Sequence, residues 1–164
     1  KEEVFIKKRE TVGSLHDILM NTGSQLVIKT VELIKESKEK PIKQTMSDVL
    51  KSAPKLTKDN TKIDWSRPVE EIDSFIRGLN PYPGAWCSLK NNNEENTVKI
   101  YNCNYVIEKH TFENGTIISS KKELKISAIN GYLNIYKMQL AGKRKMDVKS
   151  LLNGFTFDEN SKMV

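Results

Sequence analysis

The sequence predicts a mostly β fold: a small five-stranded antiparallel Greek-key barrel of the OB-like type with short helices, preceded by the strand and helix of an α/β unit. Three observations support this prediction. Short segments with apolar alternation follow one another between residues 85 and 140, and turn residues separate them. The dipeptide Asn130-Gly131, a strong hairpin signal, lies between two of these segments. Five such strands with short helices fit a small barrel.

The length and composition suit one soluble domain with flanking structure. The chain has 164 residues, and 37% of them are hydrophobic. No window approaches the roughly 18 apolar residues of a membrane-spanning helix, so we expect no membrane association. The first residue is Lys1 rather than Met, and no signal-peptide pattern follows it. We therefore expect the parent protein to extend upstream.

Residues 1–37 are predicted to be the end of an α/β domain. Residues 4–8 are expected to form a short strand, and Ser14 is expected to cap a helix that extends to about residue 36. Asp17 in its first turn and Lys35 in its last would suit the helix dipole. Little in the chain can cover the apolar face of this helix. We expect a monomer, with residues 15–36 as the route by which it could self-associate.

The polar stretch 38–62, interrupted by Pro41 and Pro54, is predicted to be a linker between domains. The barrel domain is assigned to residues 63–164. It should begin with a short helix for which Ser66 is the expected cap and Pro68 lies near the first position. The expected buried face of that helix comprises Val69, Ile72, Phe75 and Ile76.

Five strands are expected after this helix. A turn at residues 91–95 should separate the first two strands, and Asn114-Gly115 should precede the third. A short terminal helix is expected at residues 147–152. The predicted strands are residues 85–89, 97–108, 116–119, 123–128 and 132–140.

The cysteines and histidines favour packing over chemistry. Cys87 and Cys103 lie in expected strands without CxxC spacing, and His16 and His110 are scattered. Together they supply too few ligands for a disulfide scaffold or a zinc site. We therefore expect two reduced thiols, as in the cytoplasm, and no metal site.

Several other side chains have both a structural and a functional interpretation. Trp65, Tyr82 and Trp86 could stack on bases, but their positions beside prolines and strands favour packing. Asp64 could act as a catalytic carboxylate, but its place at the end of the linker favours a role in bracing the next helix. We therefore expect the three aromatic side chains to pack and Asp64 to brace the helix.

The net charge of +6 is concentrated near the carboxy terminus. Residues 115–164 contain nine Lys or Arg and four Asp or Glu, and so carry +5 of the total. A cationic field of this kind suggests a polyanionic partner, because counterions released from phosphates favour binding. Charge alone is weak support, since lysine-rich surfaces are usually only solvated.

Three motifs together are more specific than charge. The chain contains APKLTK at 53–58 followed by IDW at 63–65, then IRGLNPYPGAW at 76–86, then QLAGKRKM at 139–146 followed by LLNG at 151–154. In this order and spacing they resemble the methionyl-tRNA formyltransferase family. The segment ETVGSLHD at 10–17 resembles the entry to the last helix of that family's catalytic domain. Tyr82 stands where the family usually has Trp, and the aromatic character is kept.

The resemblance implies an enzyme of two domains. The amino-terminal domain would transfer formyl from 10-formyltetrahydrofolate to methionyl initiator tRNA, and the carboxy-terminal barrel would help to hold the tRNA. The family's catalytic Asn, His and Asp lie upstream of the region seen here, so we expect no catalytic residues and no cofactor in this chain. The resemblance and the loop positions together favour phosphate contact by Lys55, Lys58, Lys121, Lys122, Lys143, Arg144, Lys145 and Lys149.

Two other functions remain open from the sequence. The chain could be the corresponding part of a related formyltransferase that acts on a nucleotide sugar or a folate intermediate, although such enzymes should not need the basic final third. It could also be a free-standing barrel with a structural or interaction role. The sequence upstream of Lys1 would separate these alternatives.

Overall fold

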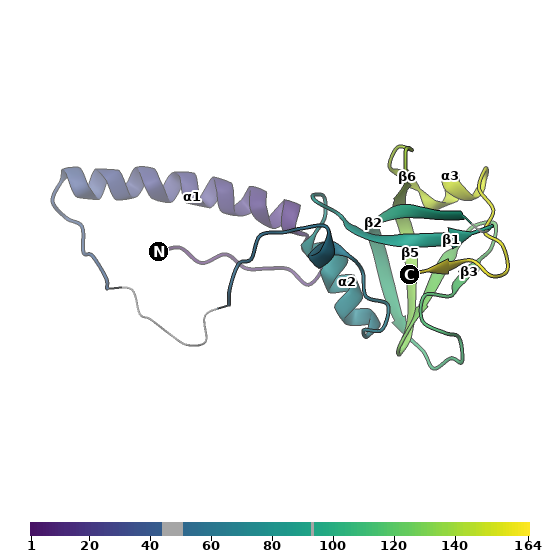
Figure 1. Cartoon of the computed structure of the whole chain (residues 1–164). Coiled ribbons are helices and arrows are strands. Elements are labelled where there is room, and N and C mark those ends of the chain that lie inside the picture. Colours follow the sequence, from purple (N-terminus) through teal and green to yellow (C-terminus); the bar gives the residue numbers. More distant parts are fainter. Residues whose placement is uncertain (44–50, 93) are drawn as a thin grey trace.

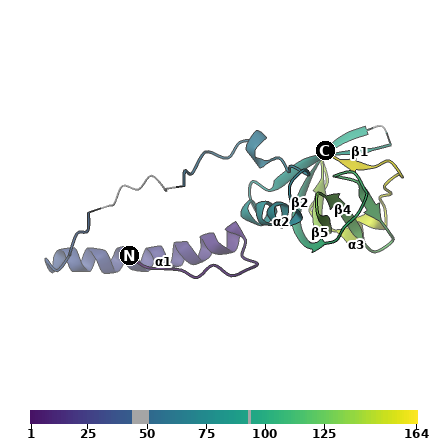
Figure 2. The same cartoon turned by 90° about the horizontal axis from the view of Figure 1, so that it is seen from below.

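The computed structural model describes residues 1–43, 51–92 and 94–164. A β barrel forms one end of the molecule, and a long helix projects away from it (Figure 1). Viewed from below, the strands curve around a common interior (Figure 2). The predicted mostly β fold class is therefore confirmed.

Five main antiparallel strands form the barrel wall. They are β1 (Ala85–Asn91), β2 (Glu94–Ile107), β3 (Ile117–Ser119), β4 (Leu124–Ala128) and β5 (Gly131–Leu140). Their order is β3-β4-β5-β2-β1, so β2 lies beside β5 rather than β3. This is a Greek-key connection. All five match predicted strands, although β2 begins inside the expected turn at 91–95, of which Asn93 lies outside the described residues.

Two further strands of two residues each were not predicted, because they are too short to show alternation. β6 (Met146–Asp147) pairs with β5, and β7 (Lys162–Met163) pairs with β1. The amide of Met163 also donates to the carbonyl of Gly115, 2.9 Å away, just before β3. β7 thus closes the barrel between β1 and β3. A Cβ on Gly115 would lie 2.1 Å from the Met163 carbonyl oxygen, so this seam requires glycine.

The predicted strand at residues 4–8 is wrong. These residues form no strand, because no other described segment pairs with them. A strand is stable only where its backbone groups find partners on a neighbouring chain segment. Residues 4–8 have the apolar alternation of a strand but no such partner.

The predicted long helix is present as α1 (Val12–Lys35). Its cap is Thr11 rather than Ser14: Ser14 is the third helical residue and forms a reciprocal capping box with Thr11. Asp17 consequently lies beyond the first turn, which contains no acidic residue, whereas Lys35 lies in the last turn as expected. No helix in the described ranges is long and apolar enough to cross a membrane.

The short helix α2 (Val69–Gly78) packs against β2 and β5. Its first turn is not capped by Ser66, as predicted, because Ser66 instead donates to Asp64 in a turn before the helix. The amide of Val69 donates to Oδ1 of Asn130, 2.9 Å away in the β4–β5 hairpin. The hairpin turn therefore caps a helix that is distant in sequence.

The predicted linker ends in ordered structure against the barrel, and its residues 44–50 lie outside the described residues. A single turn of 3-10 helix, η1 (Asp59–Thr61), comes first, and the amide of Ile63 then donates a hydrogen bond to the Trp86 carbonyl, 2.8 Å away. Near the other end of the chain, α3 (Val148–Leu152) matches the predicted terminal helix and packs against β5.

One hydrophobic core fills the barrel and the space under α2. Its members come from all five main strands, from α2 and from α3, whereas no residue of α1 is buried. Cys87 and Cys103 are both free and buried, as predicted. Burial raises the pKa of the Cys87 thiol to about 12, which keeps it protonated and makes it a packing residue.

Candidate functional site

The predicted basic residues lie on several neighbouring surfaces. Lys122 and Lys149 line one cavity of about 520 Å³ along β4, β5 and α3. Lys125 adds a third cation there, but Glu123 and Asp147 supply two carboxylates. This cavity is therefore close to electrical balance. Lys121, in the same loop as Lys122, is exposed.

The loop between β5 and β6 is held in place by the barrel wall. The hydroxyl of Tyr101 donates to Oε1 of Gln139, 2.9 Å away, and Nε2 of Gln139 donates to the carbonyl of Lys143, 2.8 Å away. Lys145 lies with its Nζ 3.4 Å from the centroid of the Tyr101 ring. Lys143 and Arg144 are exposed in this loop. The basic loop is thus presented from a fixed support.

A second groove, of about 410 Å³, lies beside Tyr101 between β2, β5, α2 and the segment before α1. Lys145 lines it together with Arg9, Arg77 and Lys137. None of the described residues that line this groove carries a carboxylate. The two cavities flank β5, since Tyr136 lines the first and Lys137 the second.

A register irregularity in the sheet positions this groove. The pairing of β2 with β5 skips Tyr101, between the Ile100–Met138 and Asn102–Lys137 pairs. Such bulges bend a strand and redirect its side chains. Here the bulge lies where Tyr101 and Lys137 reach the groove.

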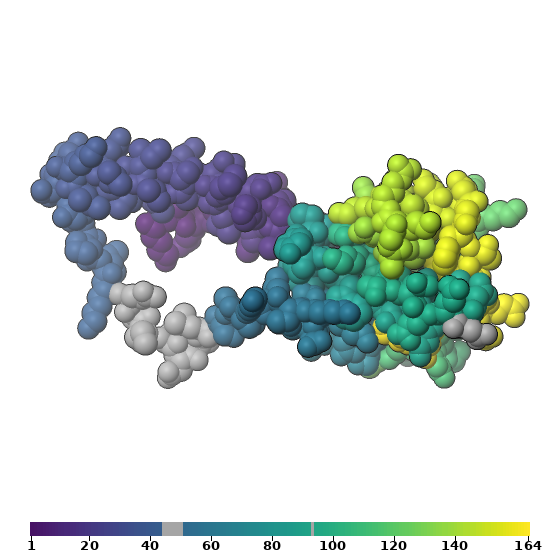
Figure 3. All heavy atoms as spheres, turned by 45° about the horizontal axis from the view of Figure 1, so that its top comes forward, coloured from purple at the N-terminus to yellow at the C-terminus, as the bar shows by residue number. Residues whose placement is uncertain are grey.

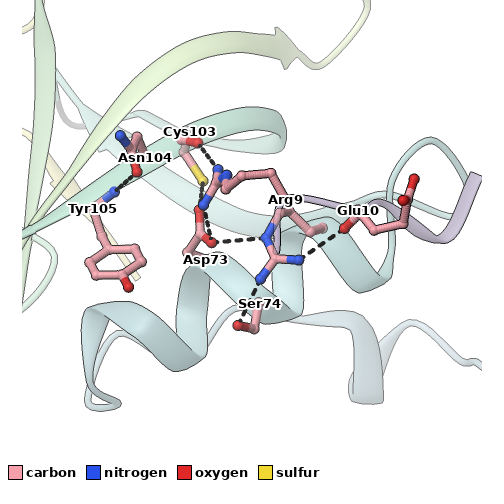
Figure 4. A network of polar contacts seen from close by, with 8 residues as sticks. Arg9, Glu10, Asp73, Ser74, Cys103, Asn104 and Tyr105 are labelled. Carbon is pink, nitrogen blue, oxygen red and sulfur yellow. Dashed lines mark hydrogen bonds and ion pairs between the residues drawn. The ribbon is translucent and has the colours of Figure 1, made fainter. Parts of the chain in front are cut away.

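The floor of the groove is a polar network around Asp73, whose side chain is 1% exposed (Figure 4). Its Oδ2 accepts from Arg9 Nη1 at 2.6 Å and from Arg77 Nε at 2.9 Å. Arg9 also donates to the carbonyl of Cys103, and Arg77 donates to the carbonyl of Glu10. The network joins the segment before α1 to α2 and β2.

The electrostatics of the groove favour an anion. Burial lowers the pKa of Lys145, and the neighbouring Lys137 and Lys99 lower it further. Asp73 provides one negative charge for the two arginines that it contacts. The cations of the groove thus exceed the carboxylate charge beneath them, which is the arrangement that a phosphate can balance.

The two predicted linker lysines differ in their surroundings. Lys58 lies with Nζ 5.0 Å from the Trp86 ring centroid, and its carbonyl accepts from Trp86 Nε1 at 2.7 Å. Lys62 approaches the same ring at 5.6 Å. Lys55 is exposed. Lys58 is therefore anchored to the barrel, on β1.

Two of the three aromatic predictions are confirmed, and one is wrong. Trp65 is buried, and Trp86 is half-buried under the two lysines. Tyr82, predicted to pack, is 84% exposed, because the turn that contains it points its side chain away from the core. Asp64 accepts from the amide and the hydroxyl of Ser66, which lowers the pKa of its carboxyl. These bonds stabilise the turn before α2, and the bracing of the helix itself by Asp64 stays a prediction.

The histidines form no group with the composition of a catalytic or metal site. His16 is exposed and lies 3.3 Å from the carboxylate of its neighbour Asp17. His110 Nε2 lies 2.7 Å from the Ala128 carbonyl, and its ring packs against Tyr132. Among the described residues, no cluster of three or more His, Cys, Asp or Glu could hold a metal ion.

Comparison with known proteins decides the family. The sequence profile of the family described as "Formyl transferase, C-terminal domain" matches residues 55–156, more than half of the chain. The chain belongs to this family. The matched range begins within the predicted linker and includes the whole wall of the barrel.

Two similar curated proteins are named methionyl-tRNA formyltransferase. A methionyl-tRNA formyltransferase of Flavobacterium johnsoniae is 45% identical over 161 residues, which are 98% of this chain and 51% of the relative. One from Flavobacterium psychrophilum is 37% identical, over 96% of this chain and 50% of the relative. The chain thus spans about half the length of the curated relatives it matches.

A solved structure supports the fold alone. HypX from Aquifex aeolicus in complex with tetrahydrofolic acid is 19% identical and superposes with a TM-score of 0.62. The match covers 94% of this chain and 28% of HypX. At this identity, the likeness shows a shared fold that includes the segment before the barrel.

Sequence reasoning missed three of the four groove cations. Arg9 was counted within an α/β remnant, Arg77 within a helix and Lys137 within a strand. Arg77 and Lys137 stand apart from other basic residues in sequence, so no local cluster marked them, whereas Arg9 ends the basic run Lys7-Lys8-Arg9, a local signal that could have marked it. Only the pairing of β2 with β5 and the ion pairs with Asp73 bring them together with Lys145.

Proposed function

We propose that this chain is the carboxy-terminal part of a methionyl-tRNA formyltransferase and that it holds initiator tRNA. The whole enzyme would transfer a formyl group from 10-formyltetrahydrofolate to methionyl initiator tRNA in the cytoplasm. The observation that carries this proposal is the family match, together with an alignment to a relative of that name over 98% of this chain and 51% of the relative. The basic groove beside a fixed basic loop supports an RNA-holding role.

In this proposal the contacts position the RNA and do not read its sequence. Lysine and arginine on loops contact phosphates, which fix the register of a nucleic acid without distinguishing its bases. The proposed contact residues are Lys55, Lys58, Lys121, Lys122, Lys143, Arg144, Lys145 and Lys149. Chemistry would belong to the amino-terminal half of the enzyme.

We also propose that this amino-terminal half covers α1. The helix exposes its branched apolar side chains along its length, and it projects beyond the barrel as a rod (Figure 3). A helix with an uncovered apolar face normally packs against another layer. When the amino-terminal half is absent, the same face of α1 is the surface through which two copies of the chain would associate.

Binding of initiator tRNA at several salt concentrations tests the proposal. If about four phosphates are contacted, log K should fall with log salt at a slope of roughly −3 to −4. Replacing Lys143, Arg144 and Lys145 by Ala should weaken binding while the thermal midpoint stays unchanged. Affinity that does not vary with salt would contradict the proposed function, and an equal fall in the midpoint would make the three residues structural.

A further inference from the structure

We propose that the groove formed by Arg9, Arg77, Lys137 and Lys145 is a composite site for one phosphate of an RNA backbone. It would take this phosphate only when the segment before α1 is joined to the barrel. The inference rests on the proposed function and deepens it, because it assigns three residues outside the basic loop. Two parts of the chain, distant in sequence, would then contact the same phosphate of the RNA.

The first argument is the origin of the four cations. Arg9 comes from the segment before α1, Arg77 from α2, Lys137 from β5 and Lys145 from the loop after β5. Arg9 spans a sequence separation of 64 to reach Asp73 and of 94 to reach Cys103. No single element therefore builds the site, and its geometry depends on the junction.

The second argument is the way in which Asp73 holds the two arginines. It occupies Nη1 of Arg9 and Nε of Arg77, and the Cys103 carbonyl occupies Nη2 of Arg9. An arginine has five N–H donors, so Arg9 keeps donors that the described contacts do not use. Its side chain is 45% exposed, and these donors can face the groove. The carboxylate thus orients Arg9 without consuming its capacity to bind a phosphate.

The third argument is the charge of the opposite wall. Lys137 forms no ion pair with any residue in the described ranges, although Asp147 is its backbone partner in the β5–β6 pairing. Lys145 rests on the Tyr101 ring, which attracts the ammonium group weakly and leaves its charge uncompensated. Glu10 is another nearby acid, but its side chain does not line the groove, and its Oε1 accepts from Ser14. Two lysines therefore face the arginines without a carboxylate between them.

The cavity on the other side of β5 shows why the phosphate is assigned to the groove. There, Glu123 lies 3.8 Å from Lys125, and Asp147 also contributes a negative charge. A phosphate would meet two carboxylates in that cavity and none on the lining of the groove. Both cavities carry lysines, but the groove has the larger excess of positive charge to meet the single negative charge of a backbone phosphodiester.

The test compares three variants of the whole chain, and the combination of the two groove variants, for binding to initiator tRNA. Lys137→Ala combined with Lys145→Ala removes the barrel side of the site. Arg9→Gln removes the charge on the other side. Lys90→Ala is the matched control, because Lys90 is an exposed lysine on β1 that does not line the groove. Thermal midpoints are measured for all three variants.

We expect the double lysine variant to weaken tRNA binding on the order of tenfold at low salt. It should also make the slope of log K against log salt less negative by about one, the contribution of one phosphate. Arg9→Gln should weaken binding similarly. Adding it to the double lysine variant should cause little further loss, because all three residues serve the same phosphate.

Three outcomes separate the inference from the proposed function. If the unmodified chain shows no salt-dependent tRNA binding, the proposed function fails. If it binds but the double lysine variant behaves like Lys90→Ala, the composite site is wrong and the proposed function stands. If the losses from Arg9→Gln and the lysine variant are fully additive, the two sides contact separate phosphates, which also overturns the single composite site.

Discussion

The barrel and α1 both carry rows of branched aliphatic side chains, but only the barrel buries them. Ile126 on β4 is fully buried, whereas Ile28 on α1 is 61% exposed. Both lie in regular structure that the sequence pattern predicted. The difference shows that periodicity specifies an element and one of its faces, while a second layer must be present before that face contributes to stability.

Within the described residues, the backbone hydrogen bond between the two regions lies at the beginning of α1. The amide of Gly13 donates to the Asn80 carbonyl at 3.0 Å, and the Asp73 network lies immediately beside this contact. A Cβ on Gly13 would lie 2.4 Å from Pro81 Cδ, so the close approach requires glycine. The barrel should therefore determine the unfolding free energy of the chain, and the junction should determine the direction of α1.

The largest effect is expected from a matched pair of isoleucine truncations. Ile126→Ala should lower the free energy of unfolding by about 4 kcal/mol, because it leaves a cavity in a closed core. Ile28→Ala should change it by less than about 0.5 kcal/mol, because its side chain is already hydrated. Urea unfolding of both variants measures the difference. A large loss from Ile28→Ala at high protein concentration would instead show that a second copy covers α1.

A smaller effect is expected at the junction. Asp73→Asn keeps the shape of the side chain but leaves Arg9 and Arg77 without their carboxylate. Removing one partner of a buried ion pair costs about 3–5 kcal/mol, and hydration of the half-exposed Arg9 should reduce this to about 2 kcal/mol. Asp17→Asn, on the exposed side of α1, is the control and should be neutral. Equal thermal midpoints for the two variants would contradict a structural role for the network.

The smallest effect is expected at the cap of α2. Asn130→Ala removes the acceptor of the Val69 amide and should cost about 1 kcal/mol. Asn130 also donates from Nδ2 to Glu70, 2.9 Å away, and this bond lowers the pKa of the Glu70 carboxyl from its ordinary value of 4.5. The stability from that second bond is complete above pH 4.5 and is lost as the pH falls through the lowered pKa.

The difference between the original chain and Asn130→Ala should therefore be larger at pH 7 than at pH 3. The contribution of the helix cap does not titrate and is present at both pH values. Urea unfolding at both pH values measures the two parts. A difference that grows in acid would show that the interaction of Glu70 with Asn130 has been assigned the wrong sign.

Local signals accounted for most of the barrel. The dipeptide Asn130-Gly131 specified the β4–β5 hairpin, and alternation located all five main strands within a few residues. The failures have a common cause. β7, the cap from Asn130 and the absent strand at residues 4–8 all depend on whether a distant segment offers a hydrogen-bonding partner, which a local pattern does not record.

The candidate site likewise contains residues that the sequence could identify and residues that it could not. Lys143, Arg144 and Lys145 could be identified because they are consecutive and follow a glycine in a loop. Lys137 could not, because it is isolated in sequence. Arg9 ends the basic run Lys7-Lys8-Arg9, but only tertiary contacts place it in the groove. Tyr82 was misassigned because a turn rich in proline does not reveal which side of it faces the core.

The seam made by β7 has a consequence for synthesis of the chain on the ribosome. β1 and β3 emerge early, but the residues that join them, 161–164, emerge only after the other strands. Until then both edges offer unpaired backbone groups to any other nascent strand. Completion of the fold must therefore wait for translation of residues 161–164, so ribosomes stalled before residue 161 should hold an open, association-prone sheet.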